Sequence, residues 1–92
     1  MEEANAAEAR VVVVNERGLH ARAAARFVRL AERFDAEVMV TKDDTTVPGT
    51  SILGLMMLAA APGSELRLTA RGAQAQEAIA ALAALVRRGF DE

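Results

Sequence analysis

The sequence predicts an α+β fold in which helices cover one face of an antiparallel sheet. Segments that alternate apolar and polar residues are typical of half-buried strands, and segments with apolar residues three or four apart are typical of amphipathic helices. Along the chain these segments follow the order β-α-β-β-α-β-α, and such elements bury their apolar faces by packing in layers. The 92 residues, 52% of them hydrophobic, suit one packed domain and argue against global disorder.

The first strand and the first helix are separated by a short loop. Residues 10–14 are a β-branched run typical of a strand, and residues 15–19 form a loop that contains Gly18. A helix is predicted from His20 to about Phe34. Its apolar face comprises Ala24, Phe27, Val28, Ala31 and Phe34. The opposite face carries a row that we call the arginine ridge: Arg22, Arg26, Arg29 and Arg33.

A hairpin and a shorter helix come next. Residues 36–41 alternate as a half-buried strand should, and Asp43 and Asp44 supply the turn into a return strand at 45–47. Pro48 and Gly49 stop that strand. Ser51 then stands at a plausible N-cap before an apolar helix of about two turns at 52–58.

The last strand and the last helix have the clearest patterns. Residues 65–70 alternate, with Leu66 and Leu68 on the same side. A helix follows Gly72 and ends before Gly89, a residue type that is common just past a helix C-terminus. Its apolar positions at helical spacing are Ala75, Ala78, Ile79, Leu82, Leu85 and Val86.

We expect a flexible tail at 1–8 and a single domain at 9–92. The first residues are acidic and rich in alanine, and they lack the basic start and apolar core of a secretory signal. The valine run at 11–14 is far too short to cross a bilayer. The sequence therefore predicts a cytoplasmic protein without membrane insertion.

Composition excludes several functions. The chain has no cysteine and one histidine, so thiol chemistry and an imidazole-rich zinc site are excluded, and we expect no metal and no cofactor. A net charge of −2, with three Phe and no Tyr or Trp, provides no stacking platform and no global attraction for nucleic acid. We therefore expect no nucleic-acid partner.

The single histidine stands where a helix is predicted to begin. The first N–H groups of a helix lack internal partners, and together with the helix dipole they make an anion site. The amides of Ala21 and Arg22 would face an anion held by His20, and the Arg22 side chain adds a charge-assisted donor. Gly18 gives the preceding turn the freedom to expose the ring. From these residues alone, a phosphoryl-carrying histidine and a surface or capping histidine without chemistry both remain open.

Two short motifs become recognisable together: Gly18-Leu19-His20-Ala21-Arg22 and Ser51-Ile52-Leu53-Gly54-Leu55-Met56. The first resembles the active-site signature of the HPr family, the histidine-containing phosphocarriers of the bacterial phosphotransferase system. The second resembles that family's motif around a regulatory serine. The resemblance covers about residues 10–90 and implies an open-faced β-sandwich, a four-stranded antiparallel sheet with three helices on one face.

The resemblance also implies roles and partners. His20 would be phosphorylated on Nδ1 by Enzyme I, itself charged from phosphoenolpyruvate, and Arg22 would assist the transfer. The receiver would be an EIIA-type domain. Ser51 would match the serine phosphorylated by HPr kinase/phosphorylase in some bacteria. A structural role as the N-cap of the helix would by itself also explain a serine at this position. Residues 88–92 and 56–58 resemble the nitrogen-related regulatory branch of the family more than its sugar-transport branch.

One residue departs from the family motif, which usually continues with proline where this chain has Ala23. Proline in the first helical turn loses no internal hydrogen bond and fixes φ in advance. Alanine keeps the helix but gives up rigidity worth on the order of 1 kcal/mol. We expect a working carrier.

A docking face is expected around the two motifs. Seven nearly continuous apolar residues at 52–58 exceed what one buried face needs, although a Met and Leu stripe is ordinarily core. By resemblance, a patch of Ile52, Leu53 and Met56 joins Gly18, Ala21 and Arg26 in binding Enzyme I, EIIA domains and the kinase. The arginine ridge is either a solvated face or a surface that steers acidic partners.

The leading interpretation is a monomeric phosphocarrier that is a protein substrate and not itself an enzyme. The alternative is a small α+β regulatory module that binds a partner without phosphotransfer, in which case replacing His20 would leave function intact. A nucleic-acid module is the weakest of these three interpretations. An independent hydrolase is poorer still, because the chain has no cysteine and no second histidine.

Overall fold

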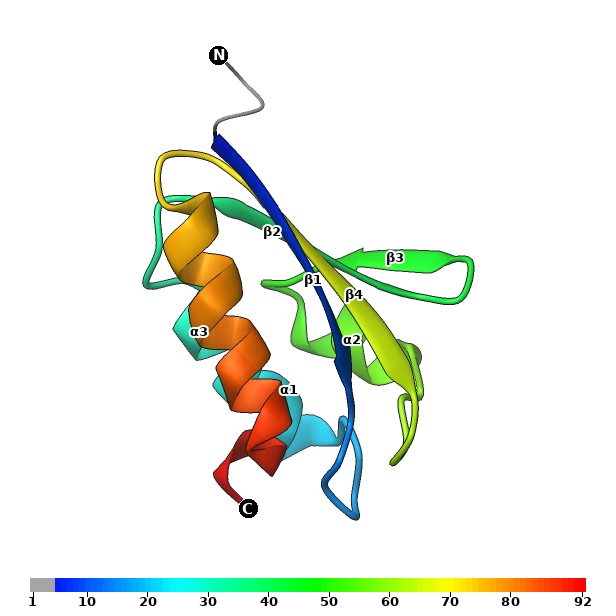
Figure 1. Ribbon diagram of the computed structural model, residues 1–92. Coiled ribbons are helices and arrows are strands. Elements are labelled where there is room, and N and C mark those ends of the chain that lie inside the picture. Colours follow the sequence, from blue (N-terminus) through cyan, green and yellow to red (C-terminus); the bar gives the residue numbers. More distant parts are fainter. Residues whose placement is uncertain (1–4) are drawn as a thin grey trace.

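The computed structural model describes residues 5–92 and has the predicted order of elements (Figure 1). In chain order these are β1 (Ala6–Val12), α1 (Ala21–Ala31), β2 (Glu37–Lys42), β3 (Thr45–Pro48), α2 (Ile52–Met57), β4 (Glu65–Arg71) and α3 (Ala75–Arg87), followed by a 3₁₀ turn, η2 (Gly89–Asp91). The helices lie on one side of the sheet, so the α+β prediction is confirmed.

The sheet has the strand order β1-β4-β2-β3, and all its pairs are antiparallel. Its register places Val11 opposite Leu66, and Val40 opposite Leu68. Because side chains alternate between the two faces of a strand, this register collects the apolar residues on the helix-covered face. Arg67, on the opposite face, is exposed. The other face of the sheet is thus left uncovered, as in an open-faced sandwich.

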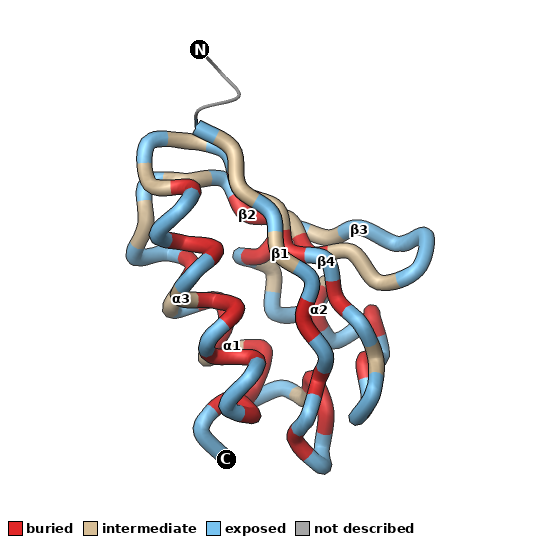
Figure 2. The backbone as a smooth tube through the Cα atoms, in the orientation of Figure 1, coloured by how far each residue is buried: buried red, intermediate tan, exposed pale blue. Residues whose placement is uncertain are grey.

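The core lies between the sheet and the helices, where Figure 2 shows the inward sides of α1 and α3 as buried. The predicted apolar face of α3 is buried throughout, and so is that of α1 except for Phe34, which is partly buried. The largest fully buried side chains are Phe27, Phe90, Leu55, Leu66, Leu68, Leu82, Val13, Val40 and Val86. Each such side chain contributes about 1.5–3 kcal/mol relative to an exposed one.

Strand β1 begins at Ala6, four positions before the strand start predicted at Arg10. The prediction of a flexible tail at 1–8 was therefore wrong for Ala6 to Glu8, and residues 1–4 lie outside the described residues. The reason is the length of the partner strand: β4 continues to Arg71, which pairs with Ala6. Ladder hydrogen bonds use only the backbone, so alanines of low β-propensity can extend a strand when a partner is present.

Helix α1 ends at Ala31, three residues before the predicted end at Phe34. The N–H of Arg33 bonds to the carbonyl of Leu30 at 3.1 Å, and the N–H of Phe34 bonds to that of Ala31 at 3.3 Å. These three-residue closures tighten the last turn, as is common at helix ends.

Candidate functional site

His20 is the N-cap of α1, as predicted. Its φ of −78° and ψ of 180° are extended, and its carbonyl accepts the N–H of Ala24 at 2.8 Å. The ring also turns back onto the helix, where Nδ1 accepts the backbone N–H of Arg22 at 3.3 Å. Nδ1 therefore occupies the place in which a helix N-terminus binds an acceptor.

The loop before His20 is anchored by Gly18. Its φ of +67° is left-handed, and a Cβ on Gly18 would come within 2.3 Å of the carbonyl oxygen of Ala60. That same oxygen accepts the N–H of Leu19 at 3.0 Å. Gly18 is buried in this loop, and its contact with partners stays a prediction. Its part is to let the loop pass close to the segment that follows α2.

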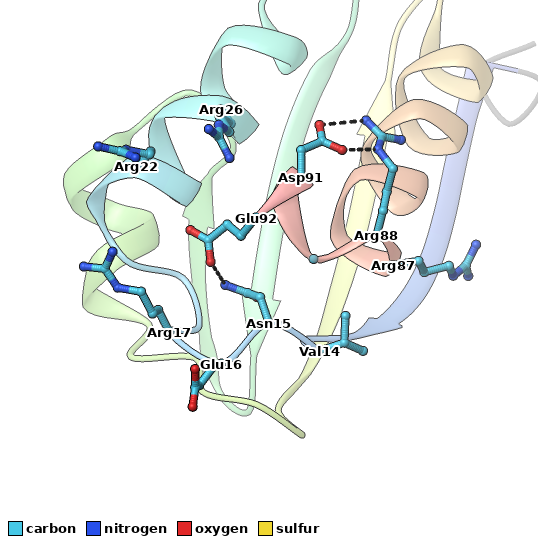
Figure 3. A pocket seen from close by; sticks show the side chains of 11 residues that line it. Val14, Asn15, Glu16, Arg17, Arg22, Arg26, Arg87, Arg88, Asp91 and Glu92 are labelled. Atoms are coloured by element: carbon cyan, nitrogen blue, oxygen red, sulfur yellow. Dashed lines mark hydrogen bonds and ion pairs between the residues drawn. The ribbon is translucent and has the colours of Figure 1, made fainter.

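A carboxylate that sequence reasoning missed lies against the histidine. The Nε2 of His20 contacts the carboxylate of Glu92. The other oxygen of that carboxylate accepts a hydrogen bond from Nδ2 of Asn15 at 3.0 Å (Figure 3). The hydrogen bond from Asn15, followed by that from His20, lowers the pKa of Glu92. His20 and Glu92 are 72 positions apart, and no local pattern in the sequence signals the contact.

An arginine-lined depression of about 780 Å³ opens beside this cluster (Figure 3). Arg22 is exposed there, whereas Arg26 is half-buried and donates from Nη1 to the carbonyl of Phe90 at 2.6 Å. Across the depression, Arg88 pairs with Asp91 at 2.7 Å and holds the pKa of that carboxyl below its ordinary value. The arginine ridge is therefore not uniform, because Arg26 is engaged in holding the C-terminal segment.

Ala23, the departure from the family motif, is fully buried in the first turn of α1. The helix begins at Ala21 immediately after its cap, so the first turn forms in the absence of proline. The methyl group of Ala23 belongs to the core cluster.

Ser51 caps α2 as predicted, and its Oγ accepts the N–H of Gly54 at 2.9 Å. Only Leu55 of this helix is buried. Its other large apolar side chains are exposed by 40–73%: Ile52, Leu53, Met56 and Met57. The predicted apolar surplus on the surface is thus confirmed, and it includes Met57, whose environment the sequence did not predict.

The structure brings the two motifs together on one side of the molecule. Helix α1 packs against α2, so the start of α1, with Ala21 and Arg22 exposed, and the apolar surface of α2 belong to neighbouring elements (Figure 1). Within residues 5–92, no three metal-ligating side chains gather into a site that could hold an ion. None of the helices in this described part is both long and apolar enough to span a bilayer.

Comparisons with known proteins identify relatives over nearly the whole chain. A family model described as "PTS HPr component phosphorylation site" matches residues 7–88. Phosphocarrier protein HPr of Neisseria meningitidis serogroup B is 48% identical over 82 residues, which is 89% of this chain and 92% of the relative. Phosphocarrier protein NPr of Escherichia coli K12 is 41% identical over 83 residues, with the same two coverages of 89% and 92%.

Solved structures agree with the fold. A crystal structure of a phosphocarrier protein HPr from Bacillus anthracis superimposes with a TM-score of 0.84 at 46% identity, covering 88% of this chain and 96% of that one. A crystal structure of an HPr dimer from Thermoanaerobacter tengcongensis gives a TM-score of 0.75 at 40% identity, covering 89% and 94%.

Proposed function

The chain belongs to the HPr family of phosphotransferase-system phosphocarriers, and on that premise we propose that His20 is its phosphorylated residue. In this proposal Nδ1 accepts the phosphoryl group from phosphorylated Enzyme I, charged from phosphoenolpyruvate, and passes it to an EIIA-type domain. The protein acts as a substrate of other enzymes. The observation that carries the proposal is the placement of Nδ1 at the start of α1, 3.3 Å from the N–H of Arg22.

The chemistry follows from that placement. The lone pair of Nδ1 attacks phosphorus in line. The bond from phosphorus to the nitrogen of the donor breaks, and its electron pair stays on that nitrogen. Once Nδ1 carries phosphorus it no longer accepts the Arg22 N–H, which becomes available to a phosphoryl oxygen. The helix dipole and the Arg22 guanidinium favour the same dianionic group. Delivery to the EIIA-type domain is the same exchange in the reverse direction.

The test is acid-labile labelling. Incubated with Enzyme I and labelled phosphoenolpyruvate, the protein should acquire one label that maps to His20, is lost in acid and is transferred onward to an EIIA-type domain. With an Enzyme I that is shown to phosphorylate another HPr, failure to label His20 would reject the proposal. It would favour a binding module that does not transfer phosphate.

Arg22→Ala should slow transfer without unfolding the protein. Arg22 is exposed, and a hydrogen bond to a charged group contributes about 1.5–3 kcal/mol, so the rate should fall roughly 10- to 150-fold. Rapid-quench measurement of label transfer from Enzyme I gives the rate. Arg33→Ala is the matched control, because Arg33 is an exposed arginine of the ridge beyond the end of α1. Equal slowing in both variants would mean that only general charge matters.

Partner docking is proposed at the junction of α1 and α2. The exposed apolar side chains of Ile52, Leu53 and Met56 supply contact area, and Ala21 and Arg22 adjoin the reacting ring. A modest interface of this kind suits partners that must separate after each transfer. The exposed arginines would steer acidic partners, an attraction that salt weakens. We propose a monomer as the working form, while the Thermoanaerobacter relative was solved as a dimer.

Regulation at Ser51 is a further part of the proposal. HPr kinase/phosphorylase with ATP should place an acid-stable label on Ser51, adding up to about two negative charges at the start of α2 and weakening docking to acidic partners. Ser51→Ala should abolish the label and lose about 1 kcal/mol of capping energy, measured by urea unfolding. Thr50→Ala is the control, since Thr50 is the neighbouring exposed hydroxyl. A label that persists in Ser51→Ala would place the site elsewhere.

A further inference from the structure

The two nitrogens of the His20 ring have different partners. Nδ1 accepts a hydrogen bond from the N–H of Arg22 and so carries no proton in this arrangement. Nε2 faces the carboxylate of Glu92, which as an ionised acid can only accept. The proton of a neutral ring therefore belongs on Nε2. In a histidine, the hydrogen bond made by one nitrogen determines which nitrogen is left free to react.

Glu92 is itself held in place by Asn15. The amide Nδ2 of Asn15 donates to Glu92 Oε1 at 3.0 Å and to the carbonyl of Gly18 at 2.8 Å. Asn15 is only 8% exposed, and its Oδ1 has no hydrogen-bond partner among residues 5–92. A flipped amide would point that oxygen at a carboxylate and a carbonyl, so the donors of Asn15 determine its orientation. The hydrogen bonds of Asn15 thus join the loop before α1 to the segment after α3.

The backbone that carries Glu92 to the ring is strained. Gly89, Phe90 and Asp91 have φ values of 69°, 57° and 64°, all left-handed. That conformation costs roughly 1–2 kcal/mol for a residue with a side chain such as Phe90. The strain is held by the fully buried ring of Phe90 and by the 2.6 Å hydrogen bond from Arg26 to its carbonyl. Strain of this kind persists where the surrounding structure imposes it, and it is frequent at functional sites.

We propose that Glu92 is a positioning residue for phosphotransfer, which keeps the proton of His20 on Nε2 and so leaves the lone pair on Nδ1. The proposal rests on the phosphocarrier function given above. It assigns no contact between Glu92 and the phosphoryl group, because the carboxylate and the reacting nitrogen lie on opposite sides of the ring.

With the proton kept on Nε2 beside Glu92, charges and electron pairs balance in both directions of transfer. When Nδ1 bonds to phosphorus, the ring keeps the Nε2 proton and becomes a cation beside the Glu92 carboxylate. When the phosphoryl group leaves, the electron pair of the P–N bond returns to Nδ1, and the ring is neutral again with its proton still on Nε2. No proton has to move, and a ring that leaves as a neutral imidazole is a better leaving group than an imidazolate.

Other charged groups line the same depression as Glu92. Arg17, from the loop, lowers the pKa of Glu92 by its charge, after the larger effects of Asn15 and His20. Arg22 and Arg26 of α1 line the depression, as do Arg87, Arg88 and Asp91 of the C-terminal segment. The hydrogen bonds from Asn15 and His20 and the charge of Arg17 favour the ionised form of Glu92, and Asp91 is paired with Arg88.

The first arm of the test uses nitrogen-15 NMR of the unphosphorylated protein and requires no transfer. The wild type should show an Nε2–H resonance of His20, displaced downfield by the carboxylate and slow to exchange with water. Glu92→Ala should lose that protected resonance. Glu92→Gln should show a weaker and less displaced one, since its single oxygen cannot accept from both Asn15 and His20. Glu65→Gln, which removes an equal charge on the open face of the sheet, should match the wild type.

The second arm measures phosphoryl transfer through His20. Glu92→Ala should slow transfer on the order of tenfold, and Glu92→Gln should fall between it and the wild type. An unprotected Nε2–H in the wild type, or an unchanged transfer rate in Glu92→Ala, would overturn the proposal. A wild type that shows the NMR signature but takes no phosphate would instead reject the phosphocarrier assignment, so the two failures are distinguishable.

Discussion

Replacement of His20 by alanine is expected to abolish acceptance of phosphate from Enzyme I, a loss of roughly a thousandfold or more. His20 is the only histidine and the chain has no cysteine, so no second side chain of the same nucleophilic class can substitute for it. Transfer of label from phosphorylated Enzyme I to the purified variant measures the effect.

The appropriate control separates the chemistry of His20 from its capping role. Alanine removes the acceptor that His20 offers to the N–H of Arg22, which costs on the order of 1 kcal/mol of helix stability. His20→Asn provides a good capping acceptor but no phosphate-accepting imidazole. Both variants should remain folded and neither should be labelled. Label on His20→Asn protein would show that phosphate goes to another residue.

Gly18→Ala is expected to destabilise the protein by about 2–4 kcal/mol, a large part of the 5–15 kcal/mol typical of a small domain. The left-handed φ of +67° costs an alanine roughly 1–2 kcal/mol. Its Cβ would also lie 2.3 Å from the backbone oxygen of Ala60, which cannot rotate away as a flexible side chain could. Relief of that overlap breaks the hydrogen bond from Leu19 to Ala60, worth about 1 kcal/mol.

Gly63→Ala provides the matched control for this prediction. Gly63 also has a positive φ, +92°, but nothing lies within 4 Å of where its Cβ would be. Gly63→Ala should therefore lose only the conformational part, roughly 1–2 kcal/mol. Urea unfolding of both variants gives the two free energies. Equal losses would show that the approach to Ala60 is unimportant, and a stable Gly18→Ala protein with slow transfer would indicate displacement of His20 alone.

Much of the fold follows from local patterns. The spacing of Phe27, Val28 and Ala31 predicted the buried face of α1, and the spacing in α3 predicted its core side chains, because burial repeats with the helical period wherever a helix packs on one side. The caps at His20 and Ser51 were predictable for a related reason. A side chain that bonds to an amide two or three residues ahead needs no distant partner.

The sequence by itself thus determined the order of the elements, the core faces and the placement of His20 at a helix start. Only the tertiary structure decided that Ala6 begins β1, that Arg26 holds the carbonyl of Phe90, and that Glu92 lies against the ring of His20. Each of these depends on contacts between residues far apart in the chain. Local sequence patterns reflect interactions between residues within one helical turn or one strand. They do not specify which distant segment of the folded chain will contact a given residue.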